Sequence, residues 1–152
     1  MFATAYRITG NAGDAEDVLQ TVFLRLLRRD RDADPLEKPE SYLRRAAINA
    51  ALDVIRSRQA EQTVPLPEES GESSGLMQTA PAQADASGLR QALSRAIAGL
   101  KPRPAEIFAL RFLEGLSNQE IAEALGISQV RVAVIVHRTR MQLRKELRPY
   151  LR

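Results

Sequence analysis

The 152-residue sequence contains no cysteine and no tryptophan, and it has a single histidine. Without cysteine the chain can form neither a disulfide nor a thiolate metal site, which fits a reducing compartment, so we expect a cytoplasmic protein. No apolar run is longer than a few residues, and the N-terminus lacks the basic and apolar segments of a signal peptide. Neither secretion nor membrane insertion is therefore expected.

Groups typical of catalysis are also scarce. His137 lies in a basic segment without a carboxylate or hydroxyl pattern around it, and its expected role is packing or a phosphate contact. The sequence has no cluster of metal-ligating residue types, no glycine-rich phosphate loop and no nucleophile elbow. We therefore expect no enzymatic activity, no metal and no cofactor.

The residues that are abundant favour helices. Ala, Leu, Glu and Arg are frequent, and no run of Val, Ile or Thr alternates with period two for long enough to form a strand. The sequence predicts an all-α fold of two small helical domains joined by a flexible linker, with a helix-turn-helix in the C-terminal domain. The predicted boundaries are residues 1–59, 60–87 and 88–152, because residues 60–87 are rich in Pro, Glu, Ser, Gly and Gln.

Two helices are predicted before the linker. Asn11 followed by Asp14 resembles a capping box, which opens a helix over about residues 14–29. Its apolar residues recur at three and four positions and predict one buried stripe. The stripe comprises Val18, Leu19, Val22, Phe23, Leu26 and Leu27. The polar residues 30–38 predict a loop. Pro39 suits the first turn of a second helix, which is predicted over about residues 40–58.

The C-terminal third carries a helix-turn-helix pattern. After a helix over residues 105–113, Ser117 and Glu120 form a capping box, Gly126 supplies the turn, and Ser128 caps the next helix. Residues 100–152 hold 10 basic and 5 acidic side chains, with the basic ones gathered on and after this last helix. That excess is typical of phosphate contacts, although a solvated cationic face would look the same.

Four stretches carry a resemblance to a known family. GLKPRPAEIFALRFLEGLSNQEIAEALGIS and VHRTRMQLRKEL resemble the fourth conserved region of the extracytoplasmic-function (ECF) sigma factors of bacterial RNA polymerase, members of the sigma-70 superfamily. TGNAGDAEDVLQTVFLRLL and SYLRRAAINAALDVIRSR resemble their second conserved region. The resemblance implies a transcription initiation factor that binds core polymerase, directs it to promoter DNA and melts the minus-10 element. An anti-sigma factor is a further implied partner, and no membrane contact is implied.

The resemblance also assigns roles to residues of the first domain. In the family, the acidic helix that corresponds to residues 14–27 docks on the largest polymerase subunit. The implied polymerase-binding residues are Asp14, Asp17, Gln20, Phe23 and Leu24, although Phe23 could equally be a core residue and Asp17 could merely complement the helix dipole.

The implied minus-10 residues are Tyr42, Arg44, Arg45, Asn49, Arg56 and Arg58. Tyr42 keeps the stacking ring that the family usually supplies with Trp, and Asn49 can face a flipped base. Packing for Tyr42 and a bond within the helix for Asn49 are the alternatives, and Asp53 is expected to orient an arginine.

The implied minus-35 residues belong to the last helix. They are Ser128, Gln129, Arg131, Arg138, Arg140 and Arg144. The sequence departs from the family here, because Ala133, Val134 and Ile135 replace polar residues on the outward face and cannot form paired hydrogen bonds with bases. This face could contact thymine methyl groups, bind a partner protein such as a regulator, or be slightly more buried.

The family usually has a further helix and a half before the segment equivalent to residues 1–9, so the first domain is expected to be N-terminally short. The resemblance also implies compaction of the free protein, with each domain covering the DNA face of the other. Two other functions remain open from the sequence. One is a helix-turn-helix regulator that acts without polymerase, and the other is a sigma-like decoy that binds a protein and not DNA.

Overall fold

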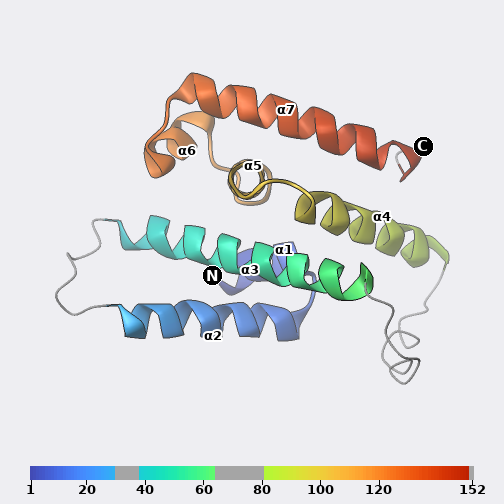
Figure 1. The fold of residues 1–152 in the computed structure, drawn as a ribbon, viewed down its shortest axis with the longest axis horizontal. Helices are drawn as coiled ribbons and strands as arrows, with labels where there is room; N and C mark the ends of the chain where they lie inside the picture. The colour runs from blue at the N-terminus through green and yellow to red at the C-terminus, as the bar shows by residue number, and fades with distance from the viewer. Residues whose placement is uncertain (30–37, 64–80, 151–152) are drawn as a thin grey trace.

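A computed structural model of the protein describes residues 1–29, 38–63 and 81–150 (Figure 1). Every regular element in this part of the chain is helical, which confirms the all-α prediction. The α-helices are α1 (Phe2–Thr9), α2 (Ala12–Arg28), α3 (Pro39–Thr63), α4 (Pro81–Ala98), α5 (Pro102–Phe108), α6 (Asn118–Leu125) and α7 (Gln129–Leu147). A π-helical turn, η3 (Ala109–Leu113), continues α5, and a 3-10 turn, η4 (Arg148–Tyr150), follows α7.

The first three helices form the N-terminal unit. The Asn11 side chain caps α2 by accepting a hydrogen bond from the Asp14 backbone N–H at 3.1 Å, as the capping pattern predicts. Helices α1, α2 and α3 all pack against one another. Val18, Val22 and Ile48 are fully buried where they meet.

The prediction of a single buried stripe along α2 is wrong in two places. Phe23 is 51% exposed and Leu27 is 82% exposed, whereas Val18 and Val22 are buried. Because α1 and α3 both pack on the side of α2 that carries Val18 and Val22, Phe23 and Leu27 project away from them. Two large apolar side chains are thus left on the solvent side of the helix.

The remaining helices form the C-terminal unit. In it, α7 packs against α4, α5 and α6. Helix α5 begins at Pro102, three residues before the predicted start, because proline is well suited to a first helical turn where no N–H partner is needed. The π turn η3 occupies the rest of the predicted segment and leads into Gly115, which has a φ of 72°.

The helices reach into both ends of the predicted linker. Helix α3 continues to Thr63 and α4 begins at Pro81, so residues 60–63 and 81–87 are helical. The centre of the predicted linker, residues 30–37 of the predicted loop, and residues 151–152 lie outside the described residues.

The helix-turn-helix forms as its capping residues predict. The Ser117 hydroxyl accepts from the Glu120 backbone N–H, and the Glu120 carboxylate accepts from the Ser117 N–H, both at 3.1 Å. Gly126 ends α6 with a φ of 67°, and the Ser128 hydroxyl accepts from the Arg131 N–H to open α7. These local contacts fix the angle at which α7 leaves the turn.

Replacing Gly126 with Ala is expected to lower the free energy of unfolding by about 1 kcal/mol, because an L side chain is disfavoured at this positive φ. A Cβ at this position would have no atom within 4 Å, so the loss would come from the backbone alone. Urea unfolding followed by circular dichroism measures it. Gly88→Ala inside α4 is the matched control and is expected to be neutral or stabilising; equal losses in both variants would contradict the turn argument.

The capping box also predicts a pH effect. The Ser117 backbone N–H and then its side chain hold the pKa of Glu120 below its ordinary value, with a smaller contribution from Arg44. The stabilisation is therefore present above the unfolded-state pKa and is lost as the pH falls through the lower folded-state pKa. Ser117→Ala is expected to raise the pKa of Glu120 in a carboxyl NMR titration, while Ser128→Ala leaves it unchanged. An unshifted Glu120 titration in Ser117→Ala would contradict the assignment.

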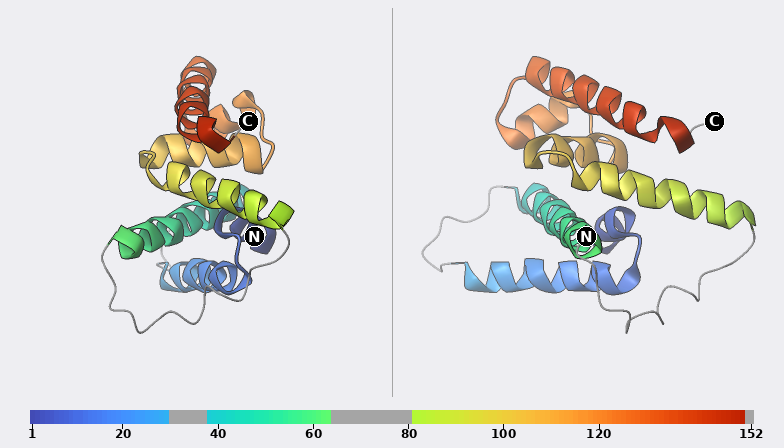
Figure 2. Two further views of the ribbon diagram at one scale, coloured as in Figure 1. Left: turned by 90° about the vertical axis from the view of Figure 1, so that its right-hand side faces the viewer. Right: turned by 45° about the vertical axis from the view of Figure 1, so that its right-hand side comes forward.

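The two units pack on each other mainly through α3, and α1 also contacts η3. Helix α3 contacts both α4 and α5, and the far side of α5 carries α7 (Figures 1 and 2). Buried residues of both units, among them Ile55 and Ile97, belong to one continuous hydrophobic cluster. The described helices thus form a closed arrangement in which α3 lies under the C-terminal unit.

Candidate nucleic-acid interface

The outward face of α2 is partly apolar. Asp17 and Gln20 are exposed there, and Phe23 and Leu24 are 51% and 50% exposed. Leu27, which sequence analysis assigned to the core, extends this face by one turn. Large apolar side chains gathered on a helix surface are typical of a protein-binding site. The placement of Phe23 excludes the alternative that it is a core residue in this conformation.

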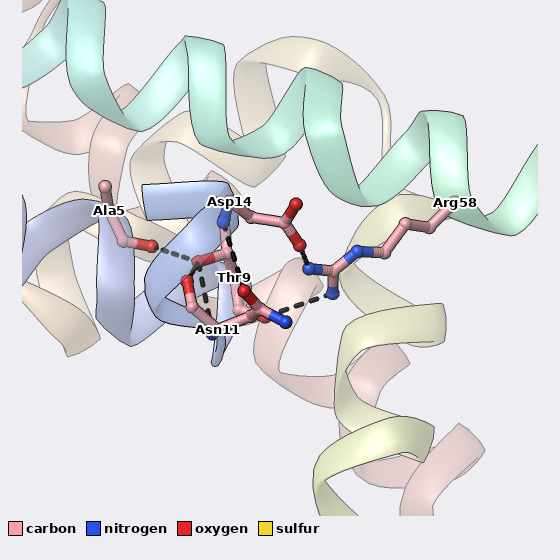
Figure 3. Close-up of polar contacts among 5 residues, drawn as sticks. All are labelled: Ala5, Thr9, Asn11, Asp14 and Arg58. Atoms are coloured by element: carbon pink, nitrogen blue, oxygen red, sulfur yellow. Dashed lines mark hydrogen bonds and ion pairs between the residues drawn. The ribbon is translucent and has the colours of Figure 1, made fainter. Parts of the chain in front are cut away.

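Asp14 and Arg58 were predicted to serve different partners, but they pair with each other in this structure (Figure 3). The Arg58 guanidinium also donates a hydrogen bond to the Thr9 carbonyl oxygen at 3.1 Å. The Thr9 hydroxyl in turn donates to the Ala5 carbonyl oxygen at 2.9 Å. These bonds join the α1–α2 corner to α3, so both charged side chains stabilise the N-terminal unit.

Two predicted minus-10 residues bind one carboxylate of the C-terminal unit. Glu106 of α5 is only 5% exposed. Its Oε1 lies 3.1 Å from Arg45 Nη2, and its Oε2 accepts a hydrogen bond from the Asn49 amide. Arg103 of α5 approaches the same carboxylate at 4.0 Å. Asn49 therefore bonds across the units and not within its own helix.

A second carboxylate, eight residues further along the chain, also pairs with the N-terminal unit. Glu114 lies 3.2 Å from Arg7 of α1 and 3.9 Å from Arg44 of α3. At the other end of the contact, Arg56 donates to the Leu100 carbonyl oxygen at 3.4 Å and pairs with Asp53 at 3.6 Å. The ion pair with Asp53 agrees with the role predicted for that residue.

Tyr42, like Arg58, is a predicted minus-10 residue that remains apart from this contact. It is 36% exposed, and the Arg29 guanidinium lies 5.7 Å from its ring centre. Arginine over an aromatic face is a cation–π contact. The stacking ring is therefore accessible while the neighbouring polar residues of α3 face the C-terminal unit.

The predicted minus-35 residues are all exposed on or beside α7. They are Ser128, Gln129, Arg131, Arg138, Arg140 and Arg144. The apolar part of the outward face differs from the prediction. Ile135 is partly buried against the core, while Val130, which was not singled out, is 74% exposed beside Ala133 and Val134.

Each unit was expected to cover the DNA-binding face of the other, but only the face on α3 is covered. Four predicted minus-10 residues contact or face the C-terminal unit, whereas the outward face of α7 lies at the edge of the molecule (Figure 1). Three residues that make the covering contact were not predicted from the sequence, namely Arg7, Glu106 and Glu114. One signal was present in the sequence, because Glu106 lies between the apolar residues Ala105 and Ile107. A charged side chain that is buried in such a segment is nearly always paired, so a partner for Glu106 could have been expected.

The described residues offer no group of three or more acidic or histidine side chains that could hold a metal ion. Within the same residues, no helix combines the length and the apolar composition needed to cross a membrane.

Comparison with known proteins matches both halves of the chain to family models. Residues 1–61 match "Sigma-70 region 2", and residues 90–143 match "Sigma-70, region 4". The RNA polymerase sigma-E factor of Streptomyces coelicolor is 31% identical over 97% of this chain and 79% of its own length. The ECF RNA polymerase sigma factor SigE of Mycolicibacterium smegmatis is 33% identical over 97% of this chain, which spans 57% of that relative.

The fold also has a solved counterpart. The sigma factor RpoE of Bartonella quintana, crystallised in complex with the anti-sigma factor NepR, aligns with a TM-score of 0.51 over 97% of this chain and 89% of that one. At 17% sequence identity this likeness concerns the arrangement of the helices alone.

Proposed function

Because the chain belongs to the ECF sigma factors of the sigma-70 family, we propose that it binds the core of bacterial RNA polymerase and directs it to promoter DNA. The observation that carries the proposal is that one chain presents two separate surfaces suited to these partners. One is the partly apolar outward face of α2, and the other is the cationic face of α7.

The proposed polymerase site is the outward face of α2. Phe23, Leu24 and Leu27 supply exposed apolar area, and Asp17 and Gln20 supply polar contacts at its edge. An apolar centre with polar neighbours is the usual composition of a binding hot spot. Asp14 lies near this face but is held by Arg58, so its contribution to polymerase binding is secondary.

The proposed minus-10 site is the face of α3 that now meets the C-terminal unit. Arg44 and Arg45 would bind phosphates, Asn49 a base, and Tyr42 a stacked base. Since Glu106 and Glu114 occupy the first three of these side chains, the C-terminal unit has to leave α3 before the DNA strand can bind there. Arg56 and Arg58 serve the same strand in this proposal once their present partners are released.

The proposed minus-35 site is α7 with its capping residue. Its exposed arginines reach the phosphates, and Gln129 and Arg131 lie at the helix start, where a helix-turn-helix contacts base edges. We assign these roles to two units, predicted over residues 1–59 and 88–152, which α3 extends forward to residue 63 and α4 extends back to residue 81. In this proposal the factor acts in the cytoplasm without catalysing a reaction, and an anti-sigma factor regulates it by binding its exposed surfaces.

Size-exclusion chromatography of the full chain with bacterial core RNA polymerase tests the proposal. Co-elution, followed by retention of promoter fragments by the complex and not by core alone, is the expected result. DNA binding without polymerase binding would indicate a helix-turn-helix regulator, and binding to neither would remove the proposal.

A further inference from the structure

An exposed apolar stripe runs along the outward side of α7. Val130, Val134 and Met141 are 74%, 41% and 51% exposed, and His137 is exposed between the last two. Their spacing of four, three and four residues places them on one line along the helix. The opposite side of α7 is buried, with Val132, Thr139 and Leu143 against the rest of the C-terminal unit.

Cationic side chains border this stripe on both sides. At 3.6 residues per turn, one border holds Arg131, Arg138 and Lys145, and the other holds Arg140 and Arg144. All five are exposed. Glu146, near the C-terminal end, is the acidic residue of this helix, so the first four turns carry positive charge alone.

An apolar centre between two cationic borders fits the major groove of DNA. The groove is about 12 Å wide and admits one α-helix, whose centre line faces the base edges while its borders face the two phosphate backbones. Thymine is the base that presents a methyl group on the groove floor. Valine side chains cannot form hydrogen bonds with bases, but they can contact that methyl group.

We propose that Val130 and Val134 read the C5-methyl groups of thymines in the major groove. The promoter element bound by α7 therefore contains thymine opposite the first two turns of the helix. This inference rests on the proposed promoter-binding function and specifies which chemical group of the element is recognised.

The charge pattern favours DNA over a protein partner for this face. A protein covering the stripe would have to place carboxylates along both borders at once, whereas DNA supplies phosphates on both sides of the groove at every step. The closed packing of the two units leaves this face uncovered, so the free protein can present it to DNA (Figure 1).

The test begins with selection of bound sequences from a library of random DNA duplexes by the full chain. The selected duplex is then made twice, once with thymine and once with deoxyuridine, which lacks only the methyl group. Fluorescence anisotropy is expected to show affinity lower by about three- to fourfold for each contacted methyl that is removed, and by about tenfold for two.

Variants assign the effect to the stripe. Val134→Ala is expected to weaken binding of the thymine duplex and to leave binding of the deoxyuridine duplex unchanged. Met141→Ala is the matched control, because Met141 lies about 10 Å along the helix from Val134 and about 16 Å from Val130, and it should keep the full preference for thymine. Equal affinity of the parent chain for both duplexes would overturn the proposed recognition of thymine methyl groups and would leave the proposed promoter binding unaffected. Failure to enrich any sequence would overturn thymine recognition by the free chain, whereas the proposed function is judged separately by promoter retention in the complex with core polymerase.

Discussion

Replacing Glu106 with Gln is expected to increase the affinity of the full chain for single-stranded DNA by about tenfold. In the closed arrangement the Glu106 carboxylate holds Arg45 at 3.1 Å and also binds the Asn49 amide, two side chains proposed to bind the minus-10 strand. Hydrogen bonds to charged groups each contribute about 1.5–3 kcal/mol, and weakening the closed state raises the fraction that can bind. Anisotropy with a labelled single-stranded oligonucleotide measures the change.

The closed contact is imperfect, which favours its release. Arg45 Nε is buried without a hydrogen-bond partner among the described residues, and such a group costs about 1–3 kcal/mol. The positive charge of Arg45 is therefore balanced by Glu106 while its hydrogen-bonding capacity is only partly used. DNA phosphates, which carry the same charge as the carboxylate, are suited to replace it.

A matched variant separates this effect from a general change of charge. Glu123→Gln removes the same charge from an exposed position on α6 and is expected to leave DNA affinity nearly unchanged. Small-angle X-ray scattering provides a second measurement, in which Glu106→Gln should have a larger radius of gyration than the parent chain. A compact Glu106→Gln variant with unchanged DNA affinity would refute the competition between this carboxylate and DNA.

The second large effect is expected at the polymerase-binding face. Changing Asp17 and Gln20 together to Ala should weaken binding to core RNA polymerase by about thirtyfold, because a combined loss of about 2 kcal/mol of binding free energy from the two polar contacts lowers the affinity by that factor. Both residues are exposed on α2, so their removal is not expected to alter the core of the N-terminal unit. Titration of labelled chain with core polymerase gives the affinity.

The control for this double variant removes the same two chemical groups from helices outside the proposed polymerase-binding face. Glu123→Ala with Gln91→Ala removes one carboxylate and one amide from exposed positions of α6 and α4. It should bind core polymerase like the parent chain. Equal weakening by both double variants would point to net charge, and unchanged binding by the α2 variant would place the polymerase site elsewhere.

Features that depend on neighbouring residues could be predicted from the sequence. Side-chain caps at Asn11, Ser117 and Ser128 and the glycine turn at Gly126 form as predicted, because a cap or turn involves atoms only a few residues apart. The same holds for the all-α class and for the exposed arginines of α7. The family resemblance could also be identified from the sequence, because it extends over two regions that occur in the same order as in the family.

Two features were decided by tertiary packing. Helix α2 carries apolar residues on more than one side, so their periodicity alone did not distinguish Val22, which is buried, from Phe23 and Leu27, which are exposed. The packing of α1 and α3 decided which side is buried. The contacts of Glu106 join residues 57 and 61 positions apart, a separation that carries no local signal. The sequence by itself determined the helices and the partners they suit, while the packing of α5 on α3 decided which DNA face is covered and which is free.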